Sequence, residues 1–173
     1  TTLFRSAEIG FEYADIDTIY RESDIITLHC PLTPETEYLI NADSISKMKP
    51  EVMLINTSRG KLINTKDLIE ALKQKRVGYA GLDVYEEESD YFFEDYSDSV
   101  IDDDILARLL TFPNVLITAH QAFFTKEALE NIARTTMDNI KKYFEEGVLP
   151  NEICYRCGQG TSSCSKIKTG RCF

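Results

Sequence analysis

Two side chains that could carry chemistry each follow a short apolar run of the sequence. Arg59 comes directly after residues 52–56, and a guanidinium can bind a carboxylate through two parallel hydrogen bonds. His120 ends the run 115–119, and an imidazole titrates close enough to neutral pH to transfer protons. Each also has a structural interpretation, as an ion pair at a helix end or a structural histidine. His29 ends another apolar run and competes with His120.

A carboxylate beside the histidine would orient the imidazole and favour its protonated form. Glu86, Glu87 and Glu88 follow a third apolar run, and their positions in the sequence do not separate them. An arginine, a histidine and an acid together suit a small 2-keto or 2-hydroxy acid substrate. Its oxidation or reduction needs a hydride carrier, which is a nicotinamide cofactor and not a side chain.

The elements that must position these residues are short apolar runs separated by helical patterns. The runs cover residues 24–30, 52–56, 79–85 and 115–119. Helical patterns cover residues 40–47, a segment from residue 64 that Asn64 or Thr65 would cap, and residues 125–146. Thr125 would cap the last of these helices, and Gly147 would end it. This alternation predicts βαβ units and a parallel sheet with both faces covered. Ligands bind at the carboxyl ends of the strands in such sheets, so we expect the site there.

Composition and charge exclude several partners. A net charge of −10 argues against non-specific binding to nucleic acid, which depends on Lys and Arg. No apolar run approaches the roughly 20 residues of a membrane-spanning helix, and no secretory signal opens the chain. We therefore expect a cytoplasmic protein. The acidic and aromatic stretch 86–104 indicates a solvated loop, with a carboxylate metal site as the alternative.

Four of the five cysteines lie in the last part of the chain, at Cys154, Cys157, Cys164 and Cys172. Four thiolates could hold zinc or an iron–sulfur cluster. The other interpretations are a reduced, flexible tail and redox disulfides. The reduced tail is preferred, so we expect no metal, and the four cysteines remain the alternative.

Four segments of the chain resemble the D-isomer-specific 2-hydroxyacid dehydrogenases. These segments are residues 24–36, 53–60, 81–88 and 115–123. Within this family, residues 91–95, 100–104 and 120–125 resemble the fermentative D-lactate dehydrogenases. The resemblance implies that Arg59 binds the substrate carboxylate and that His120 exchanges a proton with the substrate oxygen. It selects Glu88 from the three glutamates as the partner of His120, and it selects His120 over His29.

The resemblance also implies NAD as the cofactor. The residues that it places at the nicotinamide end are Cys30, Pro31, Thr36, Thr57, Ser58, Arg59 and Asp83. For Cys30, a buried thiol with no functional role is an equally open interpretation. The implied substrates are pyruvate and D-lactate, and the implied assembly is a homodimer. The alternatives are a related enzyme with a bulkier 2-keto acid substrate and a non-catalytic binding relative.

The sequence departs from the family because it contains no Gly-x-Gly-x-x-Gly loop, which would hold the cofactor pyrophosphate. It also opens on Thr1 without a methionine, so we expect a C-terminal fragment that binds NAD poorly and is inactive by itself. The expected fold is an incomplete doubly wound (Rossmann-type) parallel α/β sheet that lacks its first two strands. Residues 11–13 would be a strand that has lost its neighbours, so we expect it to detach, to pair elsewhere or to be absent as a strand. Residues 25–28 would form an exposed apolar edge.

Three parts of the chain follow from the resemblance. Residues 1–122 would be the C-terminal part of the NAD-binding domain. Residues 123–153 would contain the helix that returns to the substrate domain, with part of its apolar face bare. Residues 154–173 would be a cysteine-rich basic tail.

Overall fold

The computed structural model describes residues 10–87, 103–148 and 151 of the chain. The chain divides into two compact units, Thr1–Ala122 and Phe123–Phe173. Glu88, the four cysteines of the tail and most of the acidic stretch lie outside the described residues, so the predictions made for them stay predictions.

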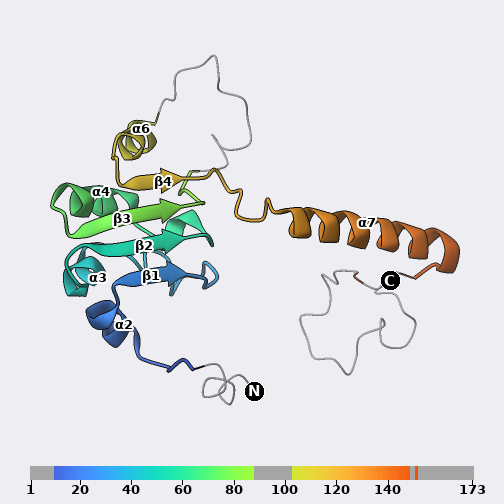
Figure 1. The fold of residues 1–173 in the computed structure, drawn as a ribbon, viewed down its shortest axis with the longest axis horizontal. Coiled ribbons are helices and arrows are strands. Elements are labelled where there is room, and N and C mark those ends of the chain that lie inside the picture. The colour runs from blue at the N-terminus through green and yellow to red at the C-terminus, as the bar shows by residue number, and fades with distance from the viewer. Residues whose placement is uncertain (1–9, 88–102, 149–150, 152–173) are drawn as a thin grey trace. The chain divides into compact units, whose positions relative to one another are not determined.

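A parallel sheet forms the centre of the first unit (Figure 1). Its strands are β1 (Ile25–Leu28), β2 (Val52–Asn56), β3 (Val77–Leu82) and β4 (Val115–Ile117), in the order β1-β2-β3-β4. Each strand pairs in parallel with the next, so the four carboxyl ends share one edge. The incomplete doubly wound α/β sheet is thus confirmed. Three strands end earlier than predicted, because the apolar runs continue into the turns that follow them.

This unit also contains four helices and a 3-10 turn, the first helix before β1 and the others between strands. They are α2 (Ile16–Glu22), α3 (Ala42–Lys47), the 3-10 turn η1 (Gly60–Leu62), α4 (Thr65–Lys73) and α6 (Asp104–Leu110). Asn64 caps α4, which selects it over Thr65. Asp103, near the end of the acidic stretch predicted as a loop, is the N-cap of α6. Its carboxylate accepts hydrogen bonds from the N–H groups of Ile105 and Leu106.

The helix predicted over residues 40–47 begins two residues later than expected. Asn41 caps α3 through a reciprocal pair of hydrogen bonds with Ser44. Ile40 is fully buried and forms an isolated parallel bridge with Ile63. Its apolar side chain therefore belongs to the core and not to a helix face.

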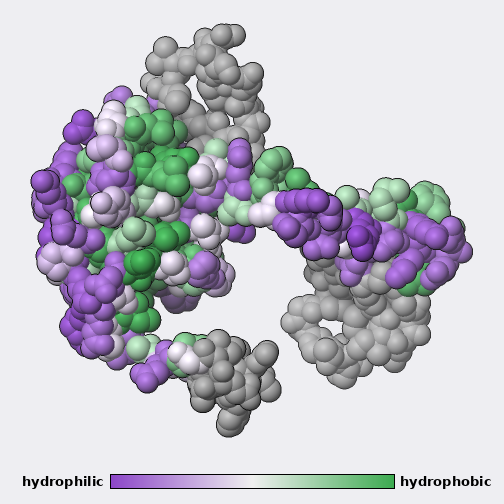
Figure 2. Space-filling view, viewed as in Figure 1, coloured by the Kyte–Doolittle hydropathy of each residue, from purple (hydrophilic) through white to green (hydrophobic). Residues whose placement is uncertain are grey.

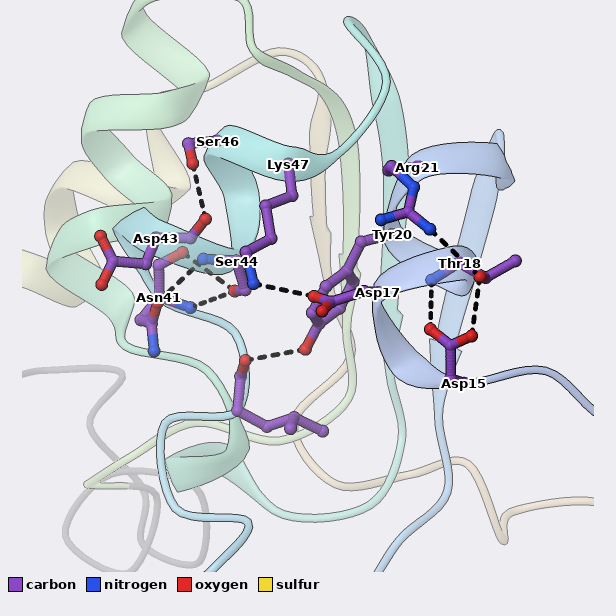
Figure 3. Close-up of polar contacts among 11 residues, drawn as sticks. Asp15, Asp17, Thr18, Tyr20, Arg21, Asn41, Asp43, Ser44, Ser46 and Lys47 are labelled. Atoms are coloured by element: carbon purple, nitrogen blue, oxygen red, sulfur yellow. Dashed lines mark hydrogen bonds and ion pairs between the residues drawn. The ribbon is translucent and has the colours of Figure 1, made fainter.

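Helix α2 is tied to α3 by polar contacts that Figure 3 shows. The Lys47 ammonium lies 2.8 Å from the Asp17 carboxylate, and the Tyr20 hydroxyl donates to the carbonyl of Leu39 at 3.1 Å. Asp15 caps α2 by accepting from the Thr18 N–H at 2.9 Å. The contacts of Lys47 and Tyr20 hold α2 beside α3.

One face of the sheet carries the hydrophobic core. Buried side chains of the strands pack against those of the helices and the 3-10 turn, among them Leu54, Val77, Leu62, Leu68 and Leu109.

The other face of the sheet is open among the described residues, and this contradicts the prediction that both faces are covered. Tyr79 and Leu116 point outward, and Leu116 is 66% exposed. A cavity of about 560 Å³ lies over this face, lined by Met53, Ile55, Thr57, Tyr79, Ala80, Gly81, Leu82, Asp83, Pro113, Asn114, Val115, Leu116 and Thr118. Figure 2 shows hydrophobic residues gathered over the strands on the side turned to the viewer. In the first unit, the described helices pack on the core face, which the apolar runs alone did not reveal.

Residues 11–13 form no strand, which is one of the outcomes expected for a strand without neighbours. The rings of Phe11 and Tyr13 contact each other edge to face and are both exposed. Among the described strands, β1 pairs only with β2, and Ile25 is 56% exposed. The exposed apolar edge is therefore confirmed.

The described part of the second unit is dominated by α7 (Lys126–Glu146). Thr125 caps this helix, and Gly147 ends it with a φ of 65°, as the sequence predicts. None of the 21 residues of α7 is buried, although Leu129, Ile132 and Ile140 form an apolar stripe at helical spacing. The apolar stripe is therefore exposed in the part of the chain that the structure describes. None of the described helices is long and apolar enough to cross a membrane.

Candidate active site

The carboxyl ends of the four strands bring most of the predicted site residues to one edge. A series of hydrogen bonds joins the segments that follow the strands. The Ser58 hydroxyl donates to the carbonyl of Cys30 at 2.7 Å, and the Asp83 N–H donates to the carbonyl of Asn56 at 2.9 Å. The His120 N–H donates to the carbonyl of Asp83 at 2.5 Å. The turns after β1, β2, β3 and β4 are thus bonded to one another in that order.

Asn56 shapes the turn that carries Arg59. Its side chain is buried, at 1% exposure, and its amide donates to the carbonyl of Arg59 at 2.9 Å. The same side chain accepts from the N–H of Ser58 at 3.1 Å. The Arg59 guanidinium is exposed at the sheet edge and donates to the carbonyl of Ser58 at 2.6 Å. The exposed guanidinium of Arg59 is therefore carried on a turn whose backbone is held by the buried Asn56 side chain.

Gly60 allows this turn to lie against the segment that follows β3. A Cβ at this position would lie 2.1 Å from the carbonyl of Tyr85 and 2.5 Å from the N–H nitrogen of Glu86. These atoms are backbone and cannot move aside cheaply. Glycine is therefore required immediately after the candidate substrate-binding arginine.

Asp83 holds the turn that carries His120. Its carboxylate accepts from the Thr118 hydroxyl at 2.5 Å and from the N–H groups of Gln121 and Ala122 at 2.7 and 2.9 Å. Burial acts to raise the pKa of Asp83, but these hydrogen bonds and the charge of His120 outweigh it, so the pKa lies below its usual value. Asp83 is therefore a buried, ionised carboxylate at the carboxyl end of β3.

The backbone at the candidate proton donor is left-handed at two successive residues. Ala119 has a φ of 42° and His120 a φ of 55°. This region costs an L-residue roughly 1–2 kcal/mol each, and is kept only where the surroundings impose it. His120 is half-buried.

The structure separates Glu86 from the other candidate acids. Its carboxylate accepts from the Thr65 N–H at 2.7 Å, at the start of α4, and from the Tyr38 hydroxyl at 2.9 Å. Glu86 therefore joins three segments of the fold. Glu87 is exposed.

Thr36 and Pro31 build a turn after β1. The Thr36 hydroxyl donates to the carbonyl of Pro31 at 2.7 Å and accepts from the N–H of Thr33 at 2.8 Å. The Cys30 side chain packs against the core. His29 lies nearby on β1's end, where its ring contacts the Thr27 hydroxyl at 2.9 Å.

Within residues 10–87, 103–148 and 151, no cluster of three or more His, Cys, Asp or Glu side chains is placed to hold a metal ion. The site as described is thus built from an exposed guanidinium, an imidazole and a buried carboxylate.

Comparison with known proteins defines the class. The family model described as "D-isomer specific 2-hydroxyacid dehydrogenase, NAD binding domain" matches residues 2–122. A 2-hydroxyacid dehydrogenase homolog of Haemophilus influenzae is 55% identical over 146 residues, and D-lactate dehydrogenase of Escherichia coli is 51% identical over 146 residues. Each alignment covers 84% of this chain and 44% of the relative. The chain belongs to the D-isomer-specific 2-hydroxyacid dehydrogenase family.

A solved structure agrees with this assignment. D-lactate dehydrogenase from Lactobacillus jensenii, determined with NAD+, matches with a TM-score of 0.71 and 39% identity. The match covers 78% of this chain and 40% of that one. The chain thus spans less than half the length of the relatives it matches. The matched domain is the family's NAD-binding domain, so NAD is its cofactor.

The described residues fit one end of this cofactor. Thr57, Asp83 and Thr118, which follow β2, β3 and β4, line one end of the cavity over the sheet face. Pro31 and Arg59 are exposed on the turns that follow β1 and β2. Nicotinamide cofactors bind outside this edge in doubly wound sheets. The glycine-rich loop for the pyrophosphate is not among the 173 residues. The site residues therefore fit the nicotinamide end and not the pyrophosphate.

Proposed function

We propose that this chain carries the acid–base and substrate-binding half of an NAD-dependent D-lactate dehydrogenase, which interconverts pyruvate and D-lactate. The main support is the hydrogen-bonded edge that places the turn of Arg59 beside Asp83 and the turn of His120. The identity of 51% with D-lactate dehydrogenase of Escherichia coli supports lactate as the hydroxy acid.

Arg59 binds the carboxylate of the 2-keto acid. Its guanidinium is exposed, is always charged and presents paired donors that match a carboxylate. The buried Asn56 side chain fixes the backbone of the turn at Ser58 and Arg59. Binding through two parallel hydrogen bonds also orients the keto carbon next to it for reaction.

His120 supplies the proton. NAD, when bound, supplies or accepts the hydride at the substrate carbon. During reduction the imidazolium of His120 protonates the substrate oxygen, and during oxidation the neutral ring takes this proton back. Glu88 orients the ring and favours its protonated form.

The remaining roles follow from the same assignment. Cys30, Pro31, Thr36, Thr57, Ser58 and Asp83 surround the nicotinamide end. Residues 1–122 belong to the cofactor domain, residues 123–153 contain the helix that returns to the substrate domain, and residues 154–173 are the cysteine-rich basic tail of the sequence. The whole protein is a cytoplasmic homodimer with no nucleic-acid or membrane partner. The chain alone has negligible turnover, because it lacks the pyrophosphate loop.

A second candidate is an enzyme of the same family with a bulkier 2-keto acid substrate. The observation in its favour is the match to the structure of a D-2-hydroxyisocaproate dehydrogenase, with a TM-score of 0.72 and 28% identity over 79% of this chain and 42% of that one.

A chimera tests the proposal. The segment of the Escherichia coli D-lactate dehydrogenase that matches this chain would be replaced by the 146 matching residues of this chain. We expect NADH-dependent reduction of pyruvate to D-lactate, faster than reduction of a branched 2-keto acid. Preference for the branched acid would favour the second candidate. A folded chimera that binds NADH and reduces neither acid would contradict both.

A further inference from the structure

The turn that carries His120 is held by hydrogen bonds to the buried side chain of Asp83. We propose that Asp83 is a positioning residue, which holds residues 118–122 in the conformation that presents His120 to the substrate. The inference rests on the proposed role of His120 as the proton donor. It adds a second residue whose loss impairs proton transfer without touching the substrate.

The hydrogen bonds of Asp83 lie on both sides of His120. Thr118 precedes the histidine by two residues, and Gln121 and Ala122 follow it; all three donate to the Asp83 carboxylate. The Asp83 carbonyl oxygen accepts the N–H of His120 itself. A single residue after β3 thus binds the turn at four points.

Burial makes these bonds effective. Asp83 is only 3% exposed, so water competes little for its oxygens. Its backbone is fixed in turn by the hydrogen bond from its N–H to the carbonyl of Asn56. Asp83 therefore anchors the turn of His120 to the end of β2, inside the sheet, and not to a surface loop.

The conformation of the turn needs such support. Ala119 and His120 both adopt the left-handed region, which L-residues leave when nothing holds them. If the bonds to Asp83 were lost, these two residues would relax toward negative φ. The imidazole, attached at the second of them, would change direction.

An ionised carboxylate suits this task better than any other side chain. It has only acceptors, and here it meets two N–H groups and a hydroxyl that donate. An asparagine at this position would turn an NH₂ group toward at least one of these donors. The lowered pKa of Asp83 agrees with this arrangement.

A role in cofactor contact alone is the competing role for Asp83, because the residue belongs to the proposed nicotinamide end and lines one end of the cavity over the sheet face. The two roles predict different losses. A positioning residue affects the rate of the proton step, whereas a cofactor contact affects the binding of NADH.

The first experiment uses the 173-residue chain itself. Amide hydrogen exchange and three-bond HN–Hα couplings would be measured by NMR for Asp83→Asn, Thr118→Val and Thr118→Ser. We expect exchange at Gln121 and Ala122 to accelerate roughly 5- to 150-fold in Asp83→Asn, as loss of a buried hydrogen-bond partner predicts. The couplings at Ala119 and His120 should lose their left-handed values. Thr118→Val should shift them partly, and Thr118→Ser, which keeps the hydroxyl, should restore them.

Two controls keep this experiment decisive. Asp24→Asn removes the same charge from an exposed side chain and should change none of these signals. Amides of β2 and β3 should stay protected in every variant. If Asp83→Asn does not fold, Thr118→Val carries the test, because it keeps the charge and the shape. Unchanged exchange and couplings around His120 would overturn the proposal.

The second experiment measures kinetics in the chimera. Asp83→Asn should lower kcat about 10- to 100-fold, the loss expected for a displaced catalytic group, with an unchanged KM for NADH. A raised KM for NADH with an unchanged kcat would assign Asp83 to the cofactor and overturn the positioning role. An inactive parent chimera would contradict the proposed function instead, and the NMR result on the chain would still decide the role of Asp83.

Discussion

The N–H of His120 donates to the carbonyl oxygen of Asp83, the first residue after β3. His120, the candidate proton donor, is thus hydrogen-bonded to Asp83, whose side chain also binds the other residues of the turn. The corresponding relationship holds on the neighbouring strand, where Asn56 at the end of β2 accepts from Ser58 and donates to Arg59. A buried polar residue at a strand end organises each of the two turns.

Stability should depend on pH through Asp83. The pKa of this carboxyl is lowered in the folded chain, so its contribution is complete above the unfolded value of about 3.9 and is lost as pH falls through the folded value. The free energy of unfolding, from urea titrations, should therefore differ more between wild type and Asp83→Asn at about pH 6 than at about pH 3. A difference that stays constant over this range would contradict the assignment.

Gly60→Ala should destabilise the chain by roughly 1–3 kcal/mol or more, because its Cβ would overlap the backbone of Tyr85. Gly81→Ala is the matched control, since a Cβ there meets only the Ile55 side chain, at 3.8 Å. Removing this strand glycine should be neutral or stabilise by about 0.5–1 kcal/mol. Urea unfolding midpoints would measure both. Equal stabilities of the two variants would show that Gly60 is not sterically required.

Tyr85→Phe should cost about 1.5–3 kcal/mol, as expected for a hydrogen bond to a charged group. The Tyr85 hydroxyl donates to Asp103 at 2.7 Å, and Asp103 also caps α6. Burial and this carboxylate raise the pKa of Tyr85, so wild type should lose stability as pH rises above about 10 and Tyr85→Phe should lose less. The exposed Tyr79→Phe is the control and should lie within about 0.5 kcal/mol of wild type. Similar losses in both variants would contradict the role of the Asp103 contact.

Arg59→Lys in the chimera should raise KM for pyruvate about 10- to 100-fold, because an ammonium cannot reproduce the paired hydrogen bonds of a guanidinium. KM for NADH should change little. Arg21→Lys, on the exposed surface of α2, is the matched control and should leave both constants unchanged. An unchanged KM for pyruvate in Arg59→Lys would show that Arg59 does not bind the substrate carboxylate.

The regular features of the fold were predictable because they depend on local patterns. Apolar runs mark all four strands, and Thr125 and Gly147 mark the ends of α7. The seven-residue helices α2 and α6 were missed, since they are too short to show a helical period. Their caps, Asp15 and Asp103, were the available signal.

The site was predictable in part. Arg59 and His120 follow strands, which the sequence indicates, and the parallel pairing brings these strand ends to one edge. The parts played by Asn56 and Asp83 were not foreseen, because a sequence does not show which donors a buried polar side chain reaches. The only sign was a polar residue directly at the end of an apolar run. The open sheet face was also not predicted. Apolar runs indicate that a strand is buried, but they do not show which segment covers each face of the sheet.

The central claim is that His120 supplies the proton in a reaction of a 2-keto acid. Comparing kcat of the chimera with that of its His120→Gln variant tests it most directly, with NADH binding followed by fluorescence. The account predicts a fall in kcat of roughly 10²- to 10⁴-fold, the contribution of general acid catalysis, while NADH binding is unchanged. A His120→Gln chimera that reduces pyruvate at the parent rate would contradict it.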